Sequence, residues 1–250
     1  MWHQTRVNEG KPCIVLLHGW GMDSRVWGGF ADALAEHFSL FLIDLPGLGR
    51  SDVVPSPYTT EAVAKALEGI TPDKAIWIGW SMGGQIATAF AAQHPERVTQ
   101  LITLASNPCF VQKNDWPCAM PQDAHGAFEK GIADNPAKTL TRFAMLQTQG
   151  ADQGKDILKQ LKTLHSDAQP TGLYESLAPL REDTRQALQS LSMPVLQIFG
   201  SEDKLVPVTA ASACEALTAQ PVVICEGAGH LPFLSHQTQV VDEILRFVGN

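Results

Sequence analysis

The sequence lacks long apolar runs. No stretch approaches the ~20 consecutive apolar residues that a membrane-spanning helix requires. The first residues, Met1-Trp2-His3-Gln4-Thr5, also lack the basic n-region and the apolar h-region of a secretory signal. We therefore expect a cytoplasmic protein without a membrane partner.

Cysteine is scarce. The five cysteines are odd in number and include no C-x-x-C pair; they are Cys13, Cys109, Cys118, Cys214 and Cys225. This usage indicates neither a disulfide framework nor a zinc site. We expect buried, reduced thiols and no bound metal.

The sequence has fewer basic than acidic residues. The chain has 18 Lys and Arg against 26 Asp and Glu, which gives a formal net charge of −8. Because nucleic-acid backbones are bound by basic surfaces, this balance argues against nucleic acid as the main partner. A local basic patch remains compatible with it.

The chain is long and apolar enough for one large core. It has 250 residues, 44% of them hydrophobic, which suits a single α/β domain. A continuous apolar run of the kind found in buried parallel strands occurs at 13–17, and similar, mostly apolar runs occur at 40–43, 74–78, 101–104, 195–199 and 222–224. Amphipathic segments of helical length separate them, for example 27–37, 60–69 and 208–217. This alternation predicts a mostly parallel central sheet with helices on both faces.

One stretch breaks the rhythm of strands and helices. From about Pro108 to Arg185 the sequence has polar helical patterns, scattered prolines and no convincing strand. We expect a helical cap at 108–185, inserted into a core formed by 1–107 and 186–250. No internal repeat or low-complexity tract is present.

The most informative motif is Gly79-Trp80-Ser81-Met82-Gly83. It follows a predicted strand and precedes a predicted helix, which is the setting of a nucleophile elbow. The tight turn strains the serine backbone and leaves room only for glycine at Gly79 and Gly83. The helix N-terminus below Ser81 favours developing negative charge.

A serine needs an imidazole to take its proton and an acid to orient that imidazole. In this fold the three follow the chain order serine, acid, histidine. Asp203 and His230 lie in loops after two later strands, at the sheet edge where open α/β sheets bind ligands. We assign Ser81 as nucleophile, Asp203 as orienting acid and His230 as base. Glu202 and His236 are the competing acid and base.

The oxyanion of a tetrahedral intermediate needs two backbone N–H donors. One comes from the residue after the nucleophile, and the other from a loop after an early strand. These positions are Met82 and Trp20. Simple core packing is the alternative for the Trp20 side chain, and His18 is interpreted as a brace for its loop.

Together, His18-Gly19-Trp20-Gly21, the motif 79–84 and Gly227-Ala228-Gly229-His230 make the chain resemble an α/β-hydrolase over nearly its whole length. Trp80, the run 20–27 and the segment 142–148 narrow the resemblance to the pimeloyl-acyl carrier protein methyl ester carboxylesterases of biotin synthesis. That resemblance implies hydrolysis of a methyl ester on a carrier-bound acyl chain. It also implies substrate contacts at Trp20, Ser81, Met82, Phe143, Ala144, Met145, Leu146, Gln147 and His230.

The expected cap is locally basic. Between residues 135 and 165, five basic residues (Lys138, Arg142, Lys155, Lys159 and Lys162) outnumber two acidic ones (Asp152 and Asp156), for a net charge of +3. Such a stripe can steer an acidic partner, and acyl carrier proteins are acidic. We therefore expect carrier contacts at Lys138, Arg142, Lys155 and Lys159. A solvated helix face is the alternative. The family typically has arginines here, and lysine lacks the bidentate fork for phosphate.

The predicted function is a monomeric serine esterase that needs no cofactor, with small esters as side substrates. A general short-chain carboxylesterase or a carbon-carbon bond hydrolase would share the fold and the three residues. A non-catalytic receptor with the same pocket is the alternative from another class. Dehalogenases and epoxide hydrolases need a carboxylate where Ser81 stands.

Overall fold

The computed structural model describes residues 1–164 and 170–249. Residues 165–169, which fall within the expected cap, and residue 250 lie outside the described residues.

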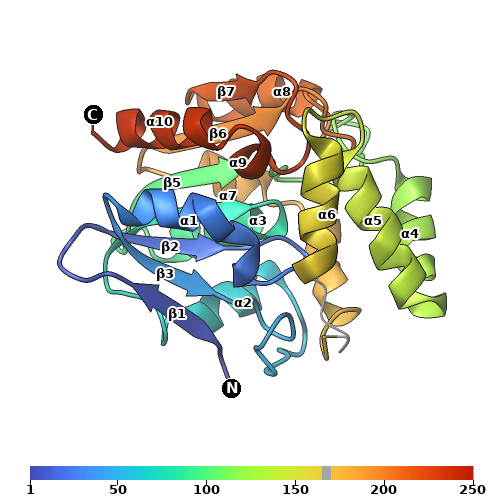
Figure 1. Cartoon of the computed structure of the whole chain (residues 1–250), viewed down its shortest axis with the longest axis horizontal. Helices are drawn as coiled ribbons and strands as arrows, with labels where there is room; N and C mark the ends of the chain where they lie inside the picture. Colours follow the sequence, from blue (N-terminus) through green and yellow to red (C-terminus); the bar gives the residue numbers. More distant parts are fainter. Residues whose placement is uncertain (165–169, 250) are drawn as a thin grey trace.

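A seven-stranded sheet forms the centre of the protein (Figure 1). Its strands are β1 (Gln4–Val7), β2 (Cys13–Leu17), β3 (Ser39–Ile43), β4 (Ala75–Trp80), β5 (Val98–Leu104), β6 (Val195–Gly200) and β7 (Val222–Cys225). They lie in the order β1-β3-β2-β4-β5-β6-β7. All neighbouring pairs are parallel except β1 and β3.

Both faces of the sheet are buried, which explains the continuous apolar runs. In β2, Ile14 and Leu16 belong to one hydrophobic cluster, whereas Val15 and Leu17 belong to another. Because successive side chains of a strand point to opposite faces, a strand covered on both sides needs apolar residues at every position.

Helices cover the two faces. The helices of the sheet layers are η1 (Ser24–Trp27), α1 (Gly28–Ala35), α2 (Thr60–Leu67), α3 (Met82–Gln93), α7 (Arg185–Gln189), α8 (Thr209–Thr218), α9 (Pro232–Ser235) and α10 (Gln237–Val248). Helices α1, α9 and α10 pack together on one face, with the cluster that contains Ile14. Helices α2 and α3 pack on the other face, with the cluster that contains Val15.

The six strands expected from the sequence are present, with bounds shifted by at most a few residues. Strand β1 was not expected. It is an edge strand with half-exposed, mostly polar residues, so it shows no apolar run. The helix expected at 27–37 is divided at Gly28, whose φ of +39° separates η1 from α1.

The segment between β5 and β6 contains the region expected as a cap. Its helices are α4 (Gln122–Asp134), α5 (Pro136–Thr148), α6 (Gly154–Leu164) and η2 (Glu175–Arg181). The described residues of 108–185 contain isolated β-bridges but no strand. We call residues 108–185 the helical insert. Figure 1 shows α4, α5 and α6 beside the edge toward which the parallel strands point.

The cysteines are free thiols. Cys13 is half-buried and the other four are buried. Burial raises the pKa of Cys214 to about 12. Within the described residues, no helix has the length and apolar character needed to cross a membrane.

Candidate active site

Ser81 occupies the turn between β4 and α3. Its backbone has a φ of +54° and a ψ of −122°, a strained conformation for a residue with a side chain. An added Cβ at Gly79 would collide with the Gly83 carbonyl group, and one at Gly83 would collide with the carbonyl oxygen of Leu17. The two glycines are therefore required by close backbone contacts, as the motif predicted.

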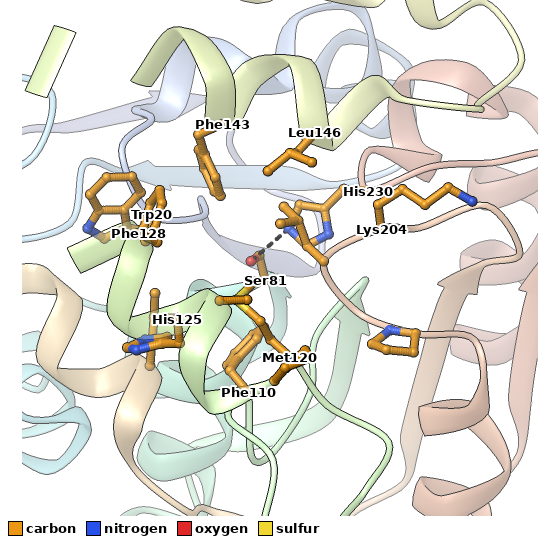
Figure 2. A pocket seen from close by; sticks show the side chains of 15 residues that line it. Trp20, Ser81, Phe110, Met120, His125, Phe128, Phe143, Leu146, Lys204 and His230 are labelled. Atoms are coloured by element: carbon orange, nitrogen blue, oxygen red, sulfur yellow. Dashed lines mark hydrogen bonds between the residues drawn. The ribbon is translucent and has the colours of Figure 1, made fainter. Parts of the chain in front are cut away.

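Ser81, His230 and Asp203 form a continuous series of hydrogen bonds. The Nε2 atom of His230 is 2.9 Å from Ser81 Oγ (Figure 2). The Nδ1 atom of His230 is 2.7 Å from Asp203 Oδ2. With the Nδ1 proton donated to the carboxylate, Nε2 is free to accept the serine proton. All three residues are buried, with exposed fractions of 6%, 1% and 6% for Ser81, His230 and Asp203.

Asp203 is held firmly in place. Its Oδ1 atom accepts hydrogen bonds from the amides of Leu205, at 2.8 Å, and Val206, at 3.0 Å. The competing acid, Glu202, is half-exposed and forms an ion pair with Lys204. Of the two adjacent carboxylates, the one assigned from the sequence, Asp203, is therefore the one that bonds to His230.

The competing base is engaged elsewhere. The Nδ1 atom of His236 is 2.8 Å from Ser235 Oγ. His236 lies at the junction of α9 and α10. Among the described residues, the imidazole that bonds to Ser81 is that of His230, and no bond links His236 to Ser81.

Two backbone amides are available beside the serine. Met82 begins α3, so its N–H has no partner within the helix. The loop with Trp20 lies against the serine, since a Cβ on Gly19 would stand 3.2 Å from Ser81 Cβ. In the part of the chain that the structure describes, neither the Trp20 amide nor the Met82 amide has a hydrogen-bond acceptor.

His18 braces the loop after β2. Its Nδ1 donates to the carbonyl oxygen of Gly19 at 2.8 Å, and its Nε2 accepts from the amide of Leu45 at 2.9 Å. Burial lowers the pKa of His18, and an accepting Nε2 requires the neutral ring. This placement agrees with a structural function for His18.

A cavity of about 260 Å³ opens beside Ser81 and His230. In Figure 2, Phe143 and Leu146 lie above the serine, whereas Phe110 and Met120 lie below it. Its walls are mostly apolar side chains, which include Trp20, Phe110, Met120, Phe128, Phe143, Leu146, Leu180 and Leu205. The Trp20 ring meets Phe128 and Phe143 edge to face, and its indole donates to the carbonyl oxygen of Leu173. Trp20 therefore packs in the core and lines the cavity.

Two polar residues of the cavity wall were not identified from the sequence. His125 is buried, and its Nε2 has no hydrogen-bond partner among the described residues. Burial, together with the charge of Arg181, lowers the pKa of His125. Lys204 lines the cavity while its ammonium group pairs with Glu202. Nothing in the local sequence pattern distinguishes either residue from an ordinary surface residue.

Only part of the segment 143–147, which was expected to contact substrate, lines the cavity, because successive residues of a helix point in different directions. Phe143 and Leu146, three residues apart on α5, line the cavity. Ala144 packs in a core cluster, and Met145 borders a separate groove near Lys155. Gln147 is buried, and its carbonyl oxygen accepts a hydrogen bond from the amide of His230. Met82, also expected to contact substrate, is fully buried and is not among the side chains that line the cavity.

The five basic residues between positions 138 and 162 of the insert are exposed. Lys138 and Arg142 lie on α5, and Lys155, Lys159 and Lys162 lie on α6. None of the five forms an ion pair with another described residue. On the same helix α6, Ile157 and Leu161 are buried, so the lysines occupy the outward face.

Similar proteins place the chain in a family. The alpha/beta hydrolase fold family matches residues 12–237. A protein from Salmonella newport named pimeloyl-[acyl-carrier protein] methyl ester esterase is 40% identical over 94% of this chain and 93% of its own length. A protein of the same name from Aeromonas salmonicida is 38% identical over 98% of each chain. The solved structure of an esterase from Exiguobacterium antarcticum aligns with a TM-score of 0.88 at 22% identity, covering 100% of this chain and 96% of that one. This chain therefore belongs to the alpha/beta hydrolase fold family, and it is similar over nearly its whole length to the Salmonella and Aeromonas proteins.

Proposed function

We propose that the protein is a serine carboxylesterase that hydrolyses the methyl ester of pimeloyl-acyl carrier protein, releasing methanol, in biotin synthesis. The hydrogen-bonded series Ser81–His230–Asp203 beside an apolar cavity is the observation that carries this proposal. The identity of 38–40% to esterases named for that substrate supports the choice of ester.

In the acylation half-reaction, Ser81 Oγ attacks the ester carbonyl carbon while His230 Nε2 accepts the serine proton. The carbonyl π electrons move to the oxygen, and the N–H groups of Met82 and Trp20 stabilise that oxyanion. The buried carboxylate of Asp203 stabilises the imidazolium. The C–O bond to the methoxy group then breaks, and His230 donates its proton to the departing oxygen, which leaves as methanol.

Deacylation repeats these steps with water. His230 takes a proton from the water as the oxygen attacks the acyl-enzyme carbonyl carbon, and the second tetrahedral intermediate uses the same two amides. Collapse of that intermediate breaks the bond to Ser81 Oγ, which recovers its proton from His230. The product is the free carboxylic acid, which ionises by losing its proton to water. His230 carries each proton transferred in the two half-reactions, so the chemistry requires no cofactor.

The cavity suits a polymethylene chain. Its walls near Ser81 are formed by Trp20, Phe143, Leu146 and other apolar side chains. Burying the five methylenes of a pimeloyl chain contributes about 4 kcal/mol at ~0.8 kcal/mol each. This energy is available only to a long acyl group, so we expect short acetyl esters to be turned over less efficiently.

We infer that the helical insert acts as a cap and a carrier-docking surface. Its helix α5 supplies Phe143 and Leu146 to the cavity and exposes Lys138 and Arg142 on its outer side. Lys155 and Lys159 extend the basic face on α6. The remainder of the chain is acidic, so these residues provide a local positive field for an acidic carrier.

Small esters form a second substrate class. Leu146 is 39% exposed although it lines the cavity, so the cavity reaches the surface without a carrier. We expect dimethyl pimelate to be hydrolysed at the same serine. A non-catalytic receptor would not need the hydrogen bond between Ser81 and His230.

The deciding experiment compares kcat/KM for pimeloyl-carrier methyl ester with that for dimethyl pimelate. We expect the carrier-bound ester to be favoured by at least about tenfold, since docking lowers the barrier through added binding energy. Turnover of the free diester alone would instead indicate a general carboxylesterase. Folded protein that hydrolyses neither ester would indicate a receptor.

A further inference from the structure

Trp80, the residue before the serine, contacts the histidine. Its indole Nε1 donates a hydrogen bond of 2.7 Å to the carbonyl oxygen of His230. The ring centroids of Trp80 and His230 are 5.6 Å apart, and Phe233 packs edge to face against the same indole at 5.3 Å. Trp80 is 1% exposed, so water does not compete for this bond.

Among the described residues, the backbone of His230 has one other hydrogen bond. His230 lies in the loop between β7 and α9, outside regular secondary structure. Its amide donates to the carbonyl oxygen of Gln147 at 3.1 Å. The loop has no sheet or helix ladder at this position, so these two bonds fix both sides of the residue that carries the imidazole.

We propose that Trp80 is a positioning residue for His230. Its N–H holds the histidine peptide so that Nε2 meets Ser81 Oγ while Nδ1 meets Asp203. Catalytic groups must be held within about 0.5 Å of their productive geometry, and a displacement of 1 Å can reduce the rate by about 100-fold. This inference rests on the proposed function only in requiring that Ser81 and His230 are the reacting pair.

The same strand contains a matched control. Trp77 is also fully buried, and it stacks on Phe90 with centroids 4.0 Å apart. The Nε1 atom of Trp77 has no hydrogen-bond partner among the described residues. Replacing either tryptophan by phenylalanine removes the same ring volume, but only one replacement removes a bond to the histidine.

The test measures hydrolysis of p-nitrophenyl butyrate by W80F and W77F. We expect kcat of W80F to fall by about 10- to 100-fold with KM within twofold, because the lost bond acts on the base and leaves the cavity wall intact. The acid limb of the pH profile of kcat/KM should move to lower pH, since a displaced imidazolium is less stabilised by Asp203. W77F should keep the parental kcat within about threefold and the parental pH profile.

A replacement of Trp80 by 3-benzothienylalanine sharpens the test. This residue keeps the bicyclic shape and has sulfur in place of N–H, so it should reproduce the kcat loss of W80F without a packing defect. Parental kcat in that variant, or equal losses in W80F and W77F, would overturn the proposal. S81A is measured in parallel: its retained activity would refute the proposed function, whereas an inactive S81A with a fully active benzothienyl variant would refute only the positioning of His230 by Trp80.

Discussion

The catalytic centre and the outer face of the helical insert differ in how their side chains are held. Asp203 accepts three hydrogen bonds and is buried. Arg142 and Lys159 are exposed and form no ion pair with other described residues. Fixed, desolvated groups suit chemistry that depends on orientation, whereas free, solvated charges suit long-range attraction. We expect substitutions at the centre to affect every ester, and substitutions of the exposed basic residues on the outer face of the insert to affect carrier-bound esters alone.

The largest effect is expected for S81A. Removal of the nucleophile should lower kcat by at least about 10⁴-fold for free and carrier-bound esters alike. The melting temperature should stay close to the parental value, because the change removes one hydroxyl without altering core packing. A steady-state assay with both substrates checks this, and substantial turnover by folded S81A would contradict the assignment of the nucleophile.

Substitutions of the two adjacent carboxylates, Asp203 and Glu202, should lower kcat by amounts that differ by orders of magnitude. D203N should lower kcat by about 10³- to 10⁴-fold, because the amide no longer stabilises the imidazolium and favours the wrong tautomer. E202Q, which alters a half-exposed ion pair, should keep kcat within about twofold. Equal losses in the two variants, measured with dimethyl pimelate, would contradict the assignment of Asp203.

Substitution of Asp44, the carboxylate that follows β3, should affect the stability of the fold and leave the ester chemistry unchanged. Burial favours a higher pKa for Asp44, but the interaction with His18, followed by the hydrogen bonds from Ser24 and Arg50, lowers it to about 2. A depressed pKa stabilises the folded state above the unfolded pKa of ~3.9, and this contribution is lost as the pH falls toward 2.

D44N should therefore lower the free energy of unfolding by about 2 kcal/mol at pH 7. The difference from the parent should shrink below pH 4. Denaturant unfolding at pH 7 and pH 3 measures both quantities, and a difference that grows on acidification would refute this account.

The smallest effect should come from the insert. The double variant R142E/K159E should lower kcat/KM by about tenfold for pimeloyl-carrier methyl ester, because the local field changes sign. Turnover of dimethyl pimelate should change by less than twofold.

The control K65E/K74E reverses two exposed charges outside the insert and should leave both kcat/KM values unchanged. Raising the salt concentration should reduce the difference between R142E/K159E and its parent. Equal losses on both substrates would argue against carrier recognition by this face.

The catalytic centre was largely predictable because local chemistry specifies it. Glycine is the only residue type that fits the close backbone contacts at positions 79 and 83, so the motif predicts the tight turn that presents Ser81. Loops after β6 and β7 can meet Ser81 only at one edge of the sheet, which predicted that His230 and an acid beside it would lie near Ser81; the choice of Asp203 over Glu202 came from the family resemblance. Strand β1 was missed because an exposed edge strand needs no apolar run.

Most of the cavity wall could not be predicted from one sequence. Phe110, His125 and Leu180 come from separate segments of the insert, and their convergence depends on how the helices pack. The bond from Trp80 to His230 spans 150 positions, a distance at which no periodic pattern gives a signal. Helix α5 was expected to contribute five consecutive contacts, but its periodicity directs only Phe143 and Leu146 into the cavity.

The bond between the His230 amide and the Gln147 carbonyl oxygen joins the base directly to α5. Because Phe143 and Leu146 of the same helix line the cavity, we expect an outward movement of α5 both to open the cavity and to remove one of the two backbone hydrogen bonds of His230.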